Sequence, residues 1–122
     1  MRIAPGCLMG AVILLAGCAP EQHAGALGDP RRGAAVILRG ACGSCHAIPG
    51  IPLADGVAGP SLAGFGARAT IAGVLANTPE HLVDWLRDPQ RYVPGGAMPT
   101  EVRSEQDTRD AAAYLQTLRS SG

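Results

Sequence analysis

Apolar residues recur at helical spacing in three stretches of the 122-residue chain, and each stretch follows a residue that can cap a helix. An aspartate and a proline at 29–30 precede the apolar run 34–38, and a threonine and a proline at 78–79 precede apolar positions within 82–86. Such an oxygen side chain can accept hydrogen bonds from the first turn, and proline suits the first helical position. We therefore predict a short helix from about residue 30 and a second from about residue 79, which the Asp-Pro pair at 88–89 ends.

A third helix is predicted near the carboxyl end of the chain. Ser104 with Asp107 three residues later resembles a capping box. The apolar face of the helix that follows holds Ala111, Tyr114, Leu115 and Leu118. Residues 48–66 and 90–102 are rich in glycine and proline and predict loops, and no strand-like alternation of any length is present. The pattern predicts an all-α domain with long loops.

The first apolar stretch of the chain has a different character. Met1-Arg2 is followed by a run to Ala16 that is shorter than the ~20 residues needed to span a bilayer, and this is the pattern of an export signal. The segment ending at Cys18 reads Leu-Ala-Gly-Cys and resembles a bacterial lipobox, in which cleavage precedes the cysteine and its sulfur is acylated. We expect a lipoprotein signal peptide at 1–17, a lipidated tether at 18–28 and one domain at 29–122. A signal anchor that stays in place is the alternative.

Cys42-Gly43-Ser44-Cys45-His46 is the segment that indicates a chemistry. Two thiols at this spacing can add across the two vinyl groups of one porphyrin, and the adjacent imidazole can then ligate the iron. A thioredoxin-type redox pair would need a βαβ pattern nearby, and a zinc site would need two more Cys or His ligands at short spacing. Neither context is present in the sequence. The segment therefore predicts one haem c, attached covalently through Cys42 and Cys45, with His46 as an axial iron ligand.

Composition agrees with a haem-centred domain. The chain has one Phe, one Trp and two Tyr, so a porphyrin would supply much of the apolar centre that aromatic side chains usually provide. Ten basic residues balance ten acidic ones, which leaves no net positive charge for nucleic acid. Any docking surface is expected to be mixed or apolar, and no small-molecule substrate is expected.

Met98 is the predicted sixth ligand of the iron. Thioether sulfur stabilises ferrous iron relative to a second imidazole, and Met98 is the only methionine left once residues 1–17 are removed. It lies in a loop flanked by prolines, whereas a methionine on a helical stripe more often packs in a core. His81 is the first alternative, and His23 in the tether is a more remote one.

With these residues in place, 29–118 resembles the class I monohaem cytochromes c, an all-α fold of three to five helices around one covalently attached haem. The segment 59–64 reads Gly-Pro-Ser-Leu-Ala-Gly and is similar to the family motif Gly-Pro-Asn-Leu-x-Gly, with Ser61 in place of asparagine. The resemblance implies that the Pro60 carbonyl accepts the proton of the second His46 ring nitrogen. It also implies that Arg68 contacts a haem propionate.

Two further expectations concern contacts inside the domain. The resemblance implies that Gly33 and Ile37 cross the last helix near Tyr114, with a less tight contact because an aromatic residue usually stands at the position of Ile37. We also expect Trp85 and Tyr92 to contact the haem.

A narrower resemblance covers about residues 73–99, which are similar to the cytochrome c domain fused to subunit II of some bacterial haem–copper oxidases. The chain lacks the copper-binding domain of those subunits, so we expect a free-standing relative. Together with the export signal and the lipobox-like segment, these resemblances imply a lipid-anchored, periplasm-facing electron carrier in the bacterial cell envelope. It would exchange single electrons with membrane-bound respiratory proteins, with a terminal oxidase as a candidate partner. With both axial positions filled, the iron offers no open site for enzymatic chemistry. The alternatives are a haem subunit of a periplasmic dehydrogenase complex and a haem sensor or peroxidase with a displaceable Met98.

Overall fold

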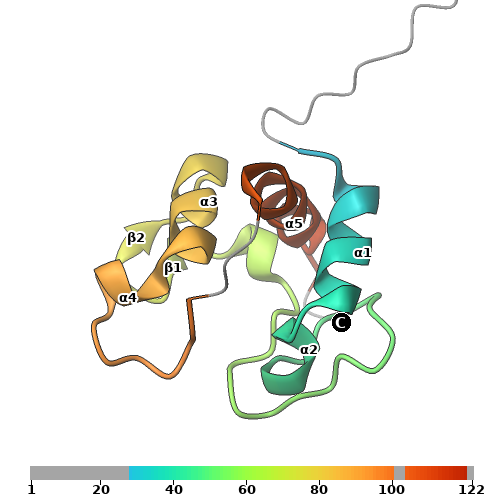
Figure 1. Ribbon diagram of the computed structural model, residues 1–122, viewed down its shortest axis with the longest axis horizontal. Helices are drawn as coiled ribbons and strands as arrows, with labels where there is room; N and C mark the ends of the chain where they lie inside the picture. The colour runs from blue at the N-terminus through green and yellow to red at the C-terminus, as the bar shows by residue number, and fades with distance from the viewer. Residues whose placement is uncertain (1–27, 101–103, 121–122) are drawn as a thin grey trace, which may run out of the picture.

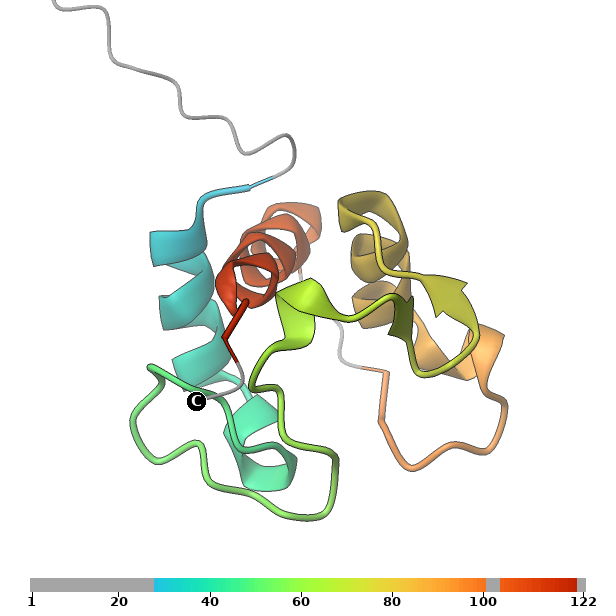
Figure 2. The ribbon, with the colours of Figure 1, turned by 180° about the vertical axis from the view of Figure 1, so that it is seen from behind.

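Three longer helices, α1 (Pro30–Arg39), α3 (Pro79–Arg87) and α5 (Glu105–Thr117), frame the domain in the computed structural model, which describes residues 28–100 and 104–120. In Figures 1 and 2, α5 lies between α1 and α3 and packs against both. The all-α prediction is confirmed for this part of the chain. The expected signal peptide, Cys18 and most of the tether lie outside the described residues.

The three predicted helix starts are confirmed by the hydrogen bonds at their caps. The Asp29 carboxylate accepts from the backbone N–H groups of Arg31 and Arg32 at 2.8 and 3.4 Å. Thr78 Oγ1 accepts from a backbone N–H of the first turn of α3 at 3.2 Å, and Ser104 Oγ accepts from one in α5 at 3.0 Å. Each cap satisfies N–H groups that the first helical turn leaves without a partner.

Short elements lie between the three longer helices, and two of them extend into the predicted loops 48–66 and 90–102. They are α2 (Cys42–Cys45), the 3-10 turn η1 (Phe65–Ala67), the antiparallel strands β1 (Thr70–Ile71) and β2 (Leu75–Ala76), and α4 (Pro89–Tyr92). The expectation of a loop from residue 90 was therefore wrong at its start, because the Asp88 side chain caps one more helical turn by accepting from the Arg91 N–H at 3.3 Å. Strands of two residues are too short to produce a visible alternation in sequence.

The crossing of α1 and α5 depends on the missing side chain of Gly33. A Cβ atom at this position would overlap the backbone carbonyl of Asp110 and lie 2.9 Å from the Cβ of Tyr114. Ile37, for which we expected a less tight contact, is only 2% exposed and lies in the core with Ala112 at 1%. The predicted crossing of the first and last helices near Tyr114 is confirmed.

The described helices are all short. Within residues 28–100 and 104–120, none has the length and apolar character that crossing a bilayer requires.

Candidate haem site

The first part of the site is a single helical turn with a histidine directly after it. Cys42 and Cys45 begin and end α2, and their i, i+3 spacing places both sulfur atoms on one side of the turn. His46 leaves the helix in an extended conformation while its backbone N–H still bonds the Cys42 carbonyl at 2.9 Å. The turn thus presents two thiols and an imidazole from five consecutive residues.

The His46 ring is held in one tautomer. Its Nδ1 lies 2.7 Å from the Pro60 carbonyl oxygen. Because a carbonyl oxygen can only accept, Nδ1 carries the proton, and Nε2 keeps the lone pair that a metal ion needs. The structure therefore contains the contact between His46 and Pro60 that the sequence resemblance implied, and this contact orients a ligand and increases its basicity.

Gly59 allows the loop to approach the imidazole closely. A Cβ atom at Gly59 would lie 2.7 Å from His46 Nδ1. The backbone N–H of Gly59 donates to the Cys45 carbonyl oxygen at 2.7 Å. Sequence reasoning assigned Gly59 only to a family motif. Its contact with the ring shows why a side chain does not fit there.

Arg68 supports the same loop. Its Nη2 donates to the carbonyl oxygens of Ser61 at 2.5 Å and Ala63 at 3.2 Å, and the guanidinium carbon lies 5.6 Å from the centre of the Phe65 ring. Arginine has five N–H donors in a fixed fork, so these two bonds do not use up its donor capacity. The role visible in the structure is to hold the loop that carries Pro60.

Met98 lies in the second part of the site, on the loop that follows α4. Its half-buried side chain lines a hollow of about 180 Å³ together with Trp85 of α3 and Gln90 of α4. The Trp85 and Tyr92 rings lie with their centres 6.5 Å apart and their planes tilted by 36°. Three residues predicted from sequence, Trp85, Tyr92 and Met98, thus come from neighbouring elements of one region.

Both parts of the site lie at the same end of the domain, but one lies on the α1 side and the other on the α3 side. In both ribbon views, α2 lies beyond the end of α1, whereas α4 and the loop after it lie under α3 (Figures 1 and 2). η1 and α5 lie between the two sides. Any group bound by both His46 and Met98 would join these two halves.

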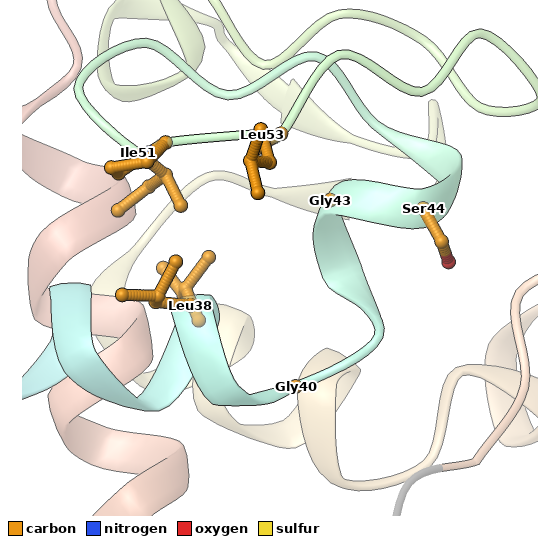
Figure 3. Close-up of a pocket in the computed structure, with 9 residues that line it drawn as sticks. Leu38, Gly40, Gly43, Ser44, Ile51 and Leu53 are labelled. Carbon is orange, nitrogen blue, oxygen red and sulfur yellow. The ribbon is translucent and has the colours of Figure 1, made fainter.

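A second hollow, of about 140 Å³, lies beside α2 and belongs to a different surface. Figure 3 shows the Leu38 side chain on one side of it and those of Ile51 and Leu53 on the other. Its lining includes none of the cysteines predicted to bind haem, nor His46 or Met98. We assign no role to it.

The alternative ligands find other surroundings. His81 Nδ1 lies 2.9 Å from the Ala76 carbonyl oxygen, so this ring nitrogen is bonded to the end of the β1–β2 hairpin. His23 lies outside the described residues. Among the residues that the structure describes, no three Cys, His, Asp or Glu side chains lie close enough together to hold a metal ion, so a protein-only zinc site finds no support.

Comparison with known proteins agrees with this geometry. The sequence profile of cytochrome c matches residues 30–119. Over 89 residues the chain is 40% identical to cytochrome c oxidase subunit 2 of Alkalihalophilus pseudofirmus. The aligned region covers 72% of this chain and 25% of that protein. The chain is 41% identical over 87 residues to cytochrome c oxidase subunit 2 of Bacillus sp. (strain PS3), covering 68% of this chain and 24% of that one. The chain thus spans about a quarter of the length of these relatives.

Solved structures show the same fold. Cytochrome c2 from Rhodobacter sphaeroides superposes with a TM-score of 0.57 at 26% identity, covering 76% of this chain and 98% of that one. Cytochrome cH from Methylobacterium extorquens gives a TM-score of 0.54 at 26% identity, covering 74% and 99%. The chain belongs to the cytochrome c family and is an electron-transfer protein. Membership implies a covalently bound haem c, with which the spacing of Cys42 and Cys45 is consistent.

The residues present fit this cofactor. Two thiols occupy one side of a helical turn, His46 is held as the tautomer with Nε2 available, and Met98 supplies a thioether on the loop after α4. Sequence reasoning did not identify Gln90, whose side chain bonds the loop of Met98. In the sequence, Gln90 is only a polar residue eight positions before the methionine, and this spacing does not predict a contact between them.

Proposed function

We propose that this protein carries single electrons through one haem c, attached by Cys42 and Cys45 and bound at the iron by His46 and Met98. The observation that carries the assignment is the hydrogen bond from His46 Nδ1 to the Pro60 carbonyl, because it leaves Nε2 as the available ligand atom. A haem of this kind supplies a one-electron ferric/ferrous couple. The chain makes and breaks no substrate bond in this scheme.

The residues proposed to surround the haem have different roles. Met98 contributes a thioether, which favours the ferrous state and raises the reduction potential relative to a second imidazole. Arg68 holds the Pro60 loop and contacts a propionate through its remaining donors. Trp85 and Tyr92, whose rings lie near each other beside the Met98 loop, would contact the apolar porphyrin.

The protein is proposed to work at a membrane facing the periplasm. Supporting this are the export pattern of residues 1–17, the lipobox-like sequence before Cys18 and the similarity to proteins named cytochrome c oxidase subunit 2. Lipid on Cys18 would confine the carrier to the membrane plane and raise its effective concentration near membrane-bound partners. A terminal haem–copper oxidase is the proposed partner.

The ligand assignment is tested on holoprotein matured in a bacterium that attaches haem c. We expect haem that resists extraction by acidified organic solvent, and reduced protein that binds carbon monoxide slowly. Met98→Ala should bind carbon monoxide rapidly and have a lower reduction potential. An unaltered spectrum and potential in Met98→Ala would overturn the ligand assignment, and rapid carbon monoxide binding by the unaltered protein would favour a sensor or peroxidase.

The cellular assignment needs its own test. Cys18→Ser should move the haem protein from the membrane to the soluble fraction, since the acyl chain is lost. Membranes that contain a haem–copper oxidase should oxidise the reduced carrier, and an oxidase inhibitor should stop this. A stable stoichiometric complex with a dehydrogenase after detergent extraction would instead support a role as a dehydrogenase subunit.

A further inference from the structure

Gln90 makes three hydrogen bonds to the loop that carries Met98. Its Nε2 donates to the carbonyl oxygens of Gly96 at 2.9 Å and Met98 at 2.7 Å. Its Oε1 accepts from the backbone N–H of Gly95 at 3.0 Å. One side chain therefore contacts three residues of the loop, including the backbone of the methionine itself.

The chemistry of these partners requires one orientation of the amide. A primary amide has two donor hydrogens on nitrogen and an acceptor oxygen. A rotated amide would place its oxygen against the two carbonyl oxygens and its NH2 group against an N–H, which would lose all three bonds. The fit of Gln90 to this loop is therefore specific to a glutamine amide.

The first turn of α4, which carries Gln90, is itself fixed by its neighbours. The preceding Pro89 is among the most deeply buried side chains, and Asp88 caps α4 by accepting from the Arg91 N–H. Asp88 Oδ1 also accepts from the hydroxyl of Thr100, two residues after Met98 in the chain, at 3.3 Å. The start of α4 thus holds the loop both before and after the Met98 side chain.

We propose that Gln90 is a positioning residue that keeps the Met98 sulfur at the haem iron. This rests on the proposed function, in which Met98 is the sixth ligand. A methionine side chain has three rotatable bonds, and Ala97 and Pro99 on either side of Met98 are exposed, so holding the sulfur at one point costs conformational entropy. The three bonds from Gln90 order the backbone in advance, as preorganisation does at any binding site. Without them the sulfur spends more time away from the iron.

The test compares Gln90→Leu with Gln116→Leu as a matched control. Gln116 is also half-buried and bonds another side chain, since its Nε2 donates to Asn77 Oδ1 at 2.9 Å, but it lies on α5 and bonds no residue of the Met98 loop in the described structure. For Gln90→Leu holoprotein we expect carbon monoxide to bind the reduced form about tenfold faster or more, as the loss of three modest hydrogen bonds implies. We also expect a weaker thioether-to-iron charge-transfer band in the ferric form and a lower potential. Gln116→Leu should lose stability and leave all three readouts unaltered.

A second variant separates the donor bonds from the size of the side chain. Gln90→Glu keeps the length and an acceptor for the Gly95 N–H but loses both donors to Gly96 and Met98. It should bind carbon monoxide at least as fast as Gln90→Leu, and it carries the test if Gln90→Leu does not yield holoprotein. If Gln90→Glu, or both variants, keep the slow rate and the full charge-transfer band while Met98→Ala loses them, the positioning role is overturned and the ligand assignment stands. If Met98→Ala also keeps them, the ligand assignment itself has failed.

Discussion

Arg32 and Asp110 join the first helix to the last through a carboxylate that is almost completely buried. Arg32 Nε donates to Asp110 Oδ2 at 2.9 Å, and the Asp110 side chain is only 2% exposed. Its Oδ1 accepts further from the Asp29 backbone N–H at 2.8 Å and from Gln106 Nε2 at 2.9 Å. A buried charge is tolerated when it is paired and hydrogen-bonded in this way. These contacts of the Asp110 carboxylate hold the start of α1 against α5.

The protonation of Asp110 follows from these contacts. Burial alone would raise the pKa of Asp110, but the hydrogen bonds from Arg32, the Asp29 N–H and Gln106 outweigh it, so the pKa lies below its ordinary value. A lowered pKa in the folded state means that the ionised carboxylate stabilises the fold at neutral pH. This contribution is complete above the unfolded-state pKa of about 4 and is lost as pH falls through the lower folded-state pKa.

We therefore predict that Asp110→Asn lowers the free energy of unfolding at pH 7 by roughly 1–3 kcal/mol, since the donors from Arg32, Asp29 and Gln106 lose a buried, ionised acceptor. The difference from the unaltered protein should shrink below about pH 4. Denaturant unfolding of both proteins across this range is the measurement. Asp84→Asn is the control, because Asp84 is 46% exposed and pairs with Arg87 at 3.5 Å, so it should cost little. A penalty for Asp110→Asn that is independent of pH would argue against this account.

Gly33→Ala should destabilise the protein although alanine is the better helix former. The new Cβ would meet the rigid Asp110 carbonyl of the facing helix, and overpacking of this kind costs roughly 1–3 kcal/mol. The exposed neighbour Ala35 provides the opposite substitution, because Ala35→Gly should show only the helix propensity cost of about 1 kcal/mol. Thermal unfolding of the two variants decides the sign, and a stabilised Gly33→Ala would mean that the helices can move apart at little cost.

Gly59→Ala should disturb the His46 ring directly, since the added carbon would lie within 3 Å of it. We expect less holoprotein and a shifted reduction potential, because a ring displaced from the Pro60 carbonyl is a poorer ligand. Ala58→Ser, at the exposed neighbouring position, should mature normally. The yield of covalent haem and the potential are the measurements, and normal values for Gly59→Ala would show that the loop adapts.

Tyr114 connects the last helix to the loop after His46. Its hydroxyl donates to the Pro49 carbonyl at 2.7 Å, and burial raises the pKa of this hydroxyl. Tyr114→Phe should lower the free energy of unfolding by about 1 kcal/mol, the net value of one such bond, and leave the reduction potential unaltered. Denaturant unfolding with spectroelectrochemistry on the same samples checks both statements. A large shift in potential would place Tyr114 closer to the redox chemistry than this structure does.

Local signals accounted for the helix starts and the haem attachment motif. Asp29, Thr78 and Ser104 each cap a helix within three residues of their own position, so neighbouring sequence contains the whole interaction. The motif ending at His46 is likewise contained in one turn and the next residue. By contrast, α4 was missed because a capped four-residue turn resembles a loop in sequence.

The sequence by itself determined the class of cofactor, the helical class of the fold and the residue types available to bind iron, because short spacings and caps carry that information. The family motif at 59–64 implied the contact of Pro60 with His46. Only the tertiary structure decided which other groups meet: Gln90 with the Met98 loop, and Asp110 with Arg32 across 78 residues. Such contacts depend on how helices cross and where loops return. Directional hydrogen bonds and the burial of one carboxylate select among those arrangements, and no local pattern encodes them.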